Sequence, residues 1–175
     1  MDLKKNRILI LGSTGFFGFN FCKKLKEKKI KFFSLTKKQC DLLNYEKSLK
    51  KIKKINPSII LNFAGKVGGI DYNINKPAEI IFNNGKITLN LFEISSQLKI
   101  KKLINIGSSC SYPSSNLPSL KEKSLFTGKL HSTVESYGFW KLLNIVASKA
   151  YKKEKKLNSL NIIFPSLYGP YDKFD

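Results

Sequence analysis

Four side chains in the second half of the sequence have the types and the spacing to carry out chemistry together. Tyr137 and Lys141 are four positions apart, so they face the same side of a helix. An ammonium group near a phenol favours the phenolate and lowers a pKa that is about 10 in water. The hydroxyl of Ser108, at a neighbouring strand end, could hold a carbonyl or alcohol oxygen against the tyrosine. The set therefore predicts proton transfer coupled to redox chemistry at a C–O carbon.

Cys110 is the fourth of these side chains, because it lies two residues after Ser108 in the same loop. The chain has three cysteines, which form neither a CxxC pair nor a metal-ligand spacing with the sole histidine, His131. Cys22 lies on an apolar helix face and is predicted to be a core residue. We expect no metal site, and a reducing, cytoplasmic setting.

Short apolar runs alternate along the chain with longer amphipathic stretches, which predicts repeated βαβ units. The expected fold class is α/β, a Rossmann-type doubly wound parallel sheet, with residues 1–175 forming one dinucleotide-binding domain. We expect strands at residues 7–11, 31–35, 58–63, 102–107 and 158–164. We expect helices at residues 15–29, 44–54, 77–98 and 134–153. The long connection 108–133, which contains Pro113, Pro118 and Gly128, follows a strand's carboxyl end, where such sheets bind ligands.

The composition fits one domain of ordinary size, since 42% of the 175 residues are hydrophobic. The formal net charge of +20 comes almost wholly from lysines scattered over the whole chain, with Arg7 as the only arginine. Recognition of nucleic acid favours arginine, so we expect no nucleic-acid partner. The apolar run at residues 8–11 is far below the roughly 20 residues that span a bilayer, so we expect no signal peptide and no membrane partner.

A glycine-rich segment joins the first expected strand to the first expected helix. Its residues are Gly12, Ser13, Thr14, Gly15, Phe16, Phe17 and Gly18. The first glycine permits a tight turn, the second lets backbone N–H groups approach a pyrophosphate, and the third lets helix pack on strand. The spacing is GxxGxxG, and alone it would equally fit a turn that binds nothing. Before a Tyr/Lys pair in a βαβ array, it predicts a dinucleotide site.

The end of the second expected strand favours NADP over NAD. A NAD site usually has a carboxylate there for the ribose 2′-hydroxyl, but this chain has Lys37 and Lys38, and no carboxylate until Asp41. Lysines at this place could pair with the 2′-phosphate of NADP; alternatively, they are two more solvated lysines. Asp41 and Leu42 would then border the adenine.

Three strings of residues resemble one family. They are Gly65-Lys-Val-Gly-Gly-Ile70, Gly107-Ser-Ser-Cys-Ser-Tyr-Pro113 and Leu167-Tyr-Gly-Pro-Tyr-Asp-Lys-Phe174. With the glycine loop and the Tyr/Lys pair, the chain resembles the GDP-L-fucose synthases, within the extended short-chain dehydrogenase/reductases and nucleotide-sugar epimerases/dehydratases. The resemblance implies a GDP-4-keto-6-deoxymannose substrate, which is epimerised at two carbons and reduced by NADPH.

The same resemblance implies roles for single residues. Ser108 and Tyr137 would hold and protonate the keto oxygen, Lys141 would bind the nicotinamide ribose, and Cys110 would be an acid/base in epimerisation. Further cofactor contacts would come from Ala64, Lys66 and Pro165. A homodimer formed through helices 77–98 and 134–153 is also implied.

The sequence departs from the family pattern at three places. Pro165-Ser-Leu-Tyr-Gly-Pro170 lacks the asparagine that relatives have in this motif, and Thr14 stands where many have a basic residue. The family's catalytic histidine would lie beyond Asp175, and His131 is not at that position. We therefore expect the substrate domain to be largely absent from this chain. The alternatives are another nucleotide-sugar epimerase/dehydratase, or an NADP-binding fragment without catalysis.

Five other residues lie near the motifs, and alternatives stay open for some of them. Trp140 is predicted to pack in the core, and His131 to lie on the surface or cap a loop. Asn83 and Asn84 either hydrogen-bond loops near the cofactor or lie on a helix surface. Lys66 either meets a phosphate or the substrate, or is a solvated loop lysine.

Overall fold

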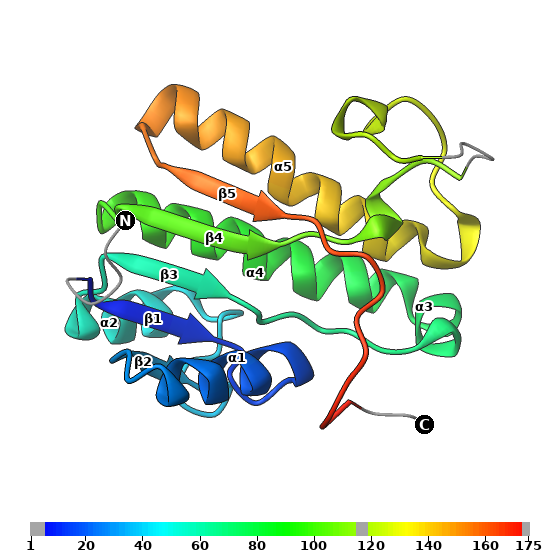
Figure 1. Cartoon of the computed structure of the whole chain (residues 1–175). Helices are drawn as coiled ribbons and strands as arrows, with labels where there is room; N and C mark the ends of the chain where they lie inside the picture. Colours follow the sequence, from blue (N-terminus) through cyan, green and yellow to red (C-terminus); the bar gives the residue numbers. More distant parts are fainter. Residues whose placement is uncertain (1–5, 115–118, 173–175) are drawn as a thin grey trace.

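The computed structural model describes residues 6–114 and 119–172, and it contains a five-stranded parallel sheet (Figure 1). The strands lie in the order β2-β1-β3-β4-β5. This is one of the two common doubly wound orders, which confirms the predicted fold class. The strands are β1 (Ile8–Leu11), β2 (Phe33–Leu35), β3 (Ile59–Asn62), β4 (Lys102–Ile106) and β5 (Ser159–Ile162).

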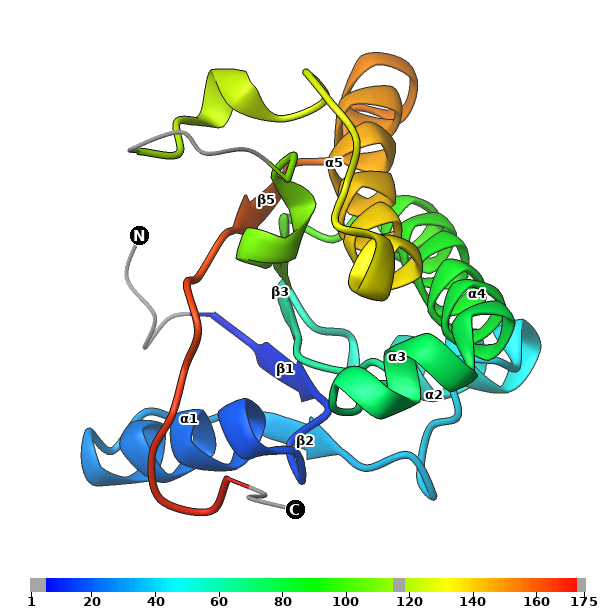
Figure 2. The ribbon, with the colours of Figure 1, turned by 90° about the vertical axis from the view of Figure 1, so that its right-hand side faces the viewer.

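Helices cover both faces of the sheet. Figure 2 shows α1 (Phe16–Glu27) on one face, and α2 (Tyr45–Ile55), α4 (Pro77–Gln97) and α5 (Glu135–Lys155) on the other. Strand β1, which lies between β2 and β3 in the sheet, is buried on both faces: Leu9 packs in the cluster that contains Phe92 of α4, whereas Ile8 packs with Leu25 of α1. A continuous apolar run is what a strand covered on both faces requires, which is why such runs predicted the strands correctly.

The ends of the helices follow local chemistry. The side chain of Asn44 caps α2 by accepting a hydrogen bond from the backbone N–H of Lys47, at 3.0 Å. Pro77 lies in the first turn of α4, as expected for a residue without an N–H group. The four predicted helices are thus confirmed, with ends that differ by no more than a few residues.

Several short elements were not predicted. The six-residue helix α3 (Ile70–Asn75) is too short to show a helical repeat, and it buries only Asn73. The predicted connection at 108–133 contains three single-turn 3₁₀ helices, η2 (Ser109–Ser111), η3 (Glu122–Ser124) and η4 (Ser132–Val134). Pro118 lies in residues 115–118, outside the described residues.

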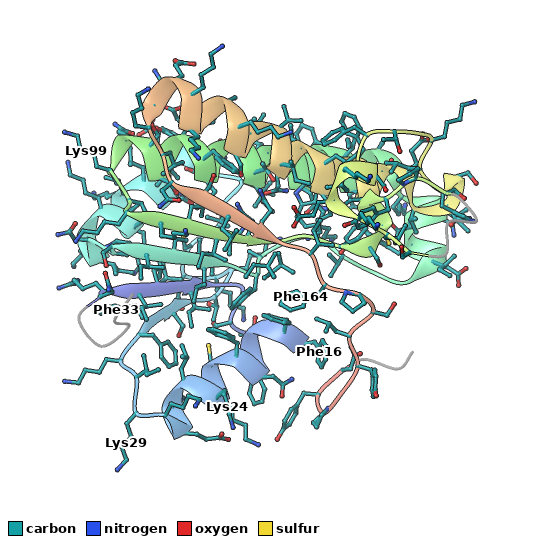
Figure 3. All side chains as sticks on the ribbon, turned by 45° about the horizontal axis from the view of Figure 1, so that its top comes forward. Phe16, Lys24, Lys29, Phe33, Lys99 and Phe164 are labelled. Atoms are coloured by element: carbon teal, nitrogen blue, oxygen red, sulfur yellow. The ribbon has the colours of Figure 1, made fainter. Side chains whose placement is uncertain are left out.

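The topology brings the predicted site residues to one edge of the sheet. Because the strands are parallel, the segments that follow β1, β3, β4 and β5 all leave from the carboxyl edge, which faces the viewer in Figure 2. Phe16 at the start of α1 and Phe164 after β5, both labelled in Figure 3, lie at this end. The site is therefore built from segments that are far apart in the sequence.

The outer faces of α4 and α5 carry exposed apolar side chains at seven-residue spacing. They are Phe82 and Leu89 on α4, and Phe139 and Val146 on α5. The two helices pack along one another (Figure 1). Pairing of these faces in a homodimer stays a prediction. Within the described residues, no helix combines the length and apolarity needed to cross a bilayer.

Candidate active site

The glycine loop after β1 is packed so closely that two of its glycines admit no side chain. Gly12 has a φ of +78°, and a Cβ on it would lie 2.5 Å from the backbone nitrogen of Ala64. A Cβ on Gly18 would overlap the carbonyl oxygen of Gly12. The first and third glycines therefore do what the motif predicts, since one forms the turn and the other lets α1 pack against it.

Gly15 differs, because the protein leaves room around it. A Cβ there would meet only the Gly12 carbonyl oxygen, at 3.6 Å, which is an ordinary contact. Gly15 is also the N-cap of α1, which has no side-chain cap and no acidic residue in its first turn. Uncapped N–H groups and the positive end of a helix dipole suit a phosphate. The loop thus fits the pyrophosphate of a dinucleotide.

The other residues of the loop divide between packing and exposure. The Phe17 ring lies 4.8 Å from the Phe63 ring and 5.3 Å from the Phe164 ring, measured between centroids, so it anchors α1 to the segments after β3 and β5. Phe16 is half-buried near Gly169. Ser13 is half-buried and Thr14 is exposed at the surface of the loop.

The turn after β2 places Lys37 and Lys38 at the surface. Asp41 accepts a hydrogen bond from the backbone N–H of Leu43, at 3.2 Å, within its own turn. The Leu42 side chain is buried in the core, and its carbonyl oxygen accepts a hydrogen bond of 2.8 Å from Asn90 of α4. Lys37 and Asp41 are therefore open to a ligand, whereas the Leu42 side chain belongs to the packing beneath.

The loop after β3 is held by buried asparagines. The fully buried Asn84 of α4 accepts a hydrogen bond from the Lys66 N–H, at 2.6 Å, and donates one to the Lys66 carbonyl oxygen, at 2.8 Å. Of the alternatives for Asn84, the structure shows the loop contact. The Lys66 ammonium pairs with Glu79 at 3.1 Å, and Ala64 donates its N–H to Asn62 at 3.1 Å.

Helix α5 and the 3₁₀ turn η2 bring the four predicted catalytic side chains together. A Cβ on Gly138 would overlap the Cys110 carbonyl oxygen, so only a glycine allows α5 to approach η2 this closely. Tyr137 consequently hydrogen-bonds to Ser108, whose Oγ also accepts from the Cys110 N–H at 3.2 Å. Cys110 is a free, half-buried thiol. The structure thus places Ser108, Cys110 and Tyr137 side by side.

Tyr137 titrates differently from the sequence-based expectation. Burial raises the pKa of its phenol, and the hydrogen bond with Ser108 opposes this only in part. The expected lowering by Lys141 is wrong for the protein without a ligand, because burial is the largest cause of the shift and Lys141 is not among the groups that lower this pKa. The phenol is consequently protonated at neutral pH, as a proton donor must be.

Lys141 is buried between β4 and its own helix. Its ammonium donates a hydrogen bond of 2.7 Å to the carbonyl oxygen of Ile106. It also lies over the rings of Trp140, at 3.9 Å, and Tyr137, at 5.3 Å from the centroids. Burial lowers the pKa of Lys141 from 10.5 to about 7. Lys141 and Tyr137 share one helix face as predicted, but the lysine carries only part of its charge at neutral pH.

Replacing Lys141 with methionine is expected to stabilise the protein most at low pH. Between pH about 7 and 10.5 the folded wild type binds fewer protons than the unfolded chain, so its stability rises with pH across this window. The variant lacks this titration. The gain should be on the order of 2–4 kcal/mol below pH 7 and should vanish near pH 10.5.

Denaturant unfolding at several pH values measures this difference. Lys152→Met, on the exposed side of the same helix, is the matched control and should follow the wild type. If the free energy of unfolding changed with pH in the same way in the wild type and in Lys141→Met, the lowered pKa of Lys141 would be contradicted.

The other residues that the sequence singled out lie partly in the core and partly at the surface. Cys22 is buried, and the His131 ring caps η4 through the Thr133 N–H, as predicted. Trp140 is buried as predicted, but its contact with the Lys141 ammonium was missed. Pro165 is exposed on the segment after β5. No cluster of potential metal ligands occurs in residues 6–114 and 119–172.

Comparison with known sequences identifies curated relatives of similar sequence. GDP-L-colitose synthase of Yersinia pseudotuberculosis is 35% identical over 170 residues, which cover 97% of this chain and 55% of that protein. GDP-L-fucose synthase of Sinorhizobium fredii is 33% identical over 173 residues, covering 99% of this chain and 55% of that protein. The chain thus spans about half the length of the curated relatives it matches.

Solved structures agree closely with the fold. The GDP-D-glycero-L-gluco-heptose synthase from Campylobacter jejuni, crystallised in the presence of NADPH, has a TM-score of 0.92 at 26% identity, covering 100% of this chain and 52% of that chain. GDP-mannoheptose C4 reductase from the same organism, with NADP bound, has a TM-score of 0.91 at 26% identity, covering 99% and 55%. The sequence model of the family described as "NAD dependent epimerase/dehydratase family" matches residues 8–175. The chain therefore belongs to the NAD dependent epimerase/dehydratase family.

Proposed function

We propose that this chain is the NADP-binding, catalytic part of an epimerase-reductase of the GDP-L-fucose synthase type, acting on GDP-4-keto-6-deoxymannose. The observation that carries the proposal is the meeting of Ser108, Cys110, Tyr137 and Lys141 at the carboxyl edge of the sheet, which also holds the uncapped start of α1. Relatives named for the synthesis of GDP-sugars support this substrate class. The domain assignment of residues 1–175 is part of the proposal.

Each catalytic side chain has a chemical role in this proposal. Ser108 and Tyr137, already hydrogen-bonded to each other, would hold the keto oxygen between them, and Tyr137 would donate its proton to that oxygen. A bound NADPH would supply the hydride to the keto carbon. Lys141 would hold the hydroxyls of the nicotinamide ribose. Because burial keeps the phenol protonated, Tyr137 is suited to the direction of reduction.

Cys110 would exchange the protons on carbons next to the keto group. Those protons are acidic because the negative charge left behind spreads onto the keto oxygen, which Ser108 and Tyr137 would stabilise. The Cys110 thiol is half-buried beside Ser108, so it is placed at the same substrate atoms. A thiol placed against an acidic C–H group can take up a proton and return it on the other face of the carbon.

The proposal includes NADP as the preferred cofactor. Lys37 and Lys38 are exposed in the turn after β2, where their ammonium groups could pair with the 2′-phosphate of NADP. Titration calorimetry should show NADPH binding at least about tenfold tighter than NADH. Lys37→Ala should reduce this preference. Lys53→Ala, which changes an exposed lysine of α2, should not. Equal affinities for the two cofactors would contradict the preference for NADP.

Turnover tests the whole proposal. The chain is mixed with NADPH and GDP-4-keto-6-deoxymannose in heavy water, and both NADPH oxidation and deuterium incorporation next to the keto carbon are followed. The expected result is both reactions. If NADPH were oxidised only with UDP- or dTDP-sugars, the protein would be another kind of nucleotide-sugar epimerase or dehydratase. If NADPH bound without any turnover, the chain would be an NADP-binding module without catalysis.

A further inference from the structure

We infer that Trp140 is a positioning residue for Lys141: the face of its indole lies against the lysine ammonium and holds it in place. Trp140 is the only tryptophan of the chain and is 3% exposed. The Lys141 ammonium lies 3.9 Å from the centroid of its ring. This is within the range in which a cation is attracted to the face of an aromatic ring. The inference deepens the proposed function, because it concerns the lysine assigned there to the nicotinamide ribose.

Three different segments fix the orientation of the indole. Its Nε1–H donates a hydrogen bond of 2.9 Å to the hydroxyl of Thr88 on α4. Its ring fills the space beside Gly65, where a Cβ would lie 2.5 Å from the indole Cη2 atom. The Tyr137 ring meets it edge-on, with centroids 5.5 Å apart. A residue held this tightly on several sides is able to hold a flexible neighbour in place.

The lysine needs such support because its aliphatic side chain is flexible and its ammonium is buried away from solvent. Besides the indole, its ammonium is held by the hydrogen bond of 2.7 Å to the Ile106 carbonyl oxygen. The titratable groups that face it are the Tyr137 phenol, on its own helix, and the Cys110 thiol, on η2. The ring and the carbonyl oxygen both favour the charged amine, in opposition to burial. Removing the ring should therefore favour the neutral amine.

Competitive acetylation of the chain without nucleotide, read out by peptide mass spectrometry across pH, measures the pKa of Lys141 directly. In the wild type, Lys141 should titrate near 7 and react at lower pH than the exposed lysines. In Trp140→Leu its pKa should fall by about one unit. Trp140→Phe keeps an aromatic face and should show a smaller fall. Phe139→Leu, the exposed neighbour on the same helix, should leave it unchanged.

An unchanged or raised pKa in Trp140→Leu would overturn the inference, because the indole would then only exclude water from the amine. A second measurement needs no change at Trp140. The fluorescence of this single tryptophan should titrate with a midpoint near 7, and Lys141→Met should abolish that transition. Fluorescence that is constant through neutral pH, or a transition that persists in Lys141→Met, would also overturn it. Both measurements omit NADPH, so failure of cofactor binding with these titrations intact contradicts the proposed function alone.

Discussion

An alanine at Gly12 or Gly18 is expected to destabilise the folded chain strongly, whereas an alanine at Gly15 is expected to leave its stability unchanged and to abolish tight NADPH binding. At Gly12 the positive φ and the overlap with the backbone after β3 act together. These two terms add up to about 2–5 kcal/mol. At Gly18 the overlap is with the Gly12 carbonyl oxygen, so α1 would have to move away from the loop.

Gly15→Ala separates the requirements of folding from those of binding. The added methyl group meets only one protein atom, at an ordinary distance, but it stands at the uncapped start of α1 where backbone N–H groups face a phosphate. The expected loss of NADPH affinity is roughly a hundredfold, or about 3 kcal/mol. Denaturant unfolding and titration calorimetry on the three variants give the two quantities.

Gly85→Ala in α4 serves as the matched control, because a Cβ there would touch only the Leu143 side chain, at 4.0 Å. It should keep both stability and binding. If Gly15→Ala bound NADPH as tightly as the wild type, the pyrophosphate could not lie against this helix start. If it unfolded instead, the loop would have a packing need that the structure does not show.

The strands, the four long helices and the glycine loop could be predicted because each depends on nearby residues. The buried run at Ile8–Leu11 indicates a strand covered on both faces, and the glycine spacing indicates a turn with a positive φ at Gly12. Strand β2 was predicted too long, since it lies at the edge of the sheet and Phe33 remains 44% exposed. There is less burial at an edge strand to hold the residues that precede it in regular structure.

The members of the site could also be named from the sequence, but not their charge states. The pKa of Tyr137 depends on how deeply α5 packs against η2, and that depth is set by Gly138. The contact of Trp140 with Lys141 depends on Gly65, which comes from a distant loop that leaves space for the indole. Periodicity predicts which face of a helix is buried, but it does not show which ring lies under which amine.

Tyr137→Phe is expected to abolish turnover while leaving folding and NADPH binding close to those of the wild type. The phenol oxygen is the group proposed to protonate the keto oxygen, and its removal should lower kcat by roughly 100- to 10,000-fold. The phenyl ring stays in its edge-on contact with Trp140, so little packing is lost. NADPH oxidation with GDP-4-keto-6-deoxymannose measures the rate, and calorimetry measures the binding.

Cys110→Ser is the variant that makes this result specific to reduction. Its hydroxyl is a far weaker acid than a thiol, so it should slow deuterium uptake next to the keto carbon. It leaves Tyr137 and Ser108 in place to serve reduction.

A Tyr137→Phe enzyme that reduces its substrate at the wild-type rate would remove the phenol from the mechanism. The proton would then have to come from Ser108 or from solvent, and the hydrogen bond between Tyr137 and Ser108 would have only a structural role.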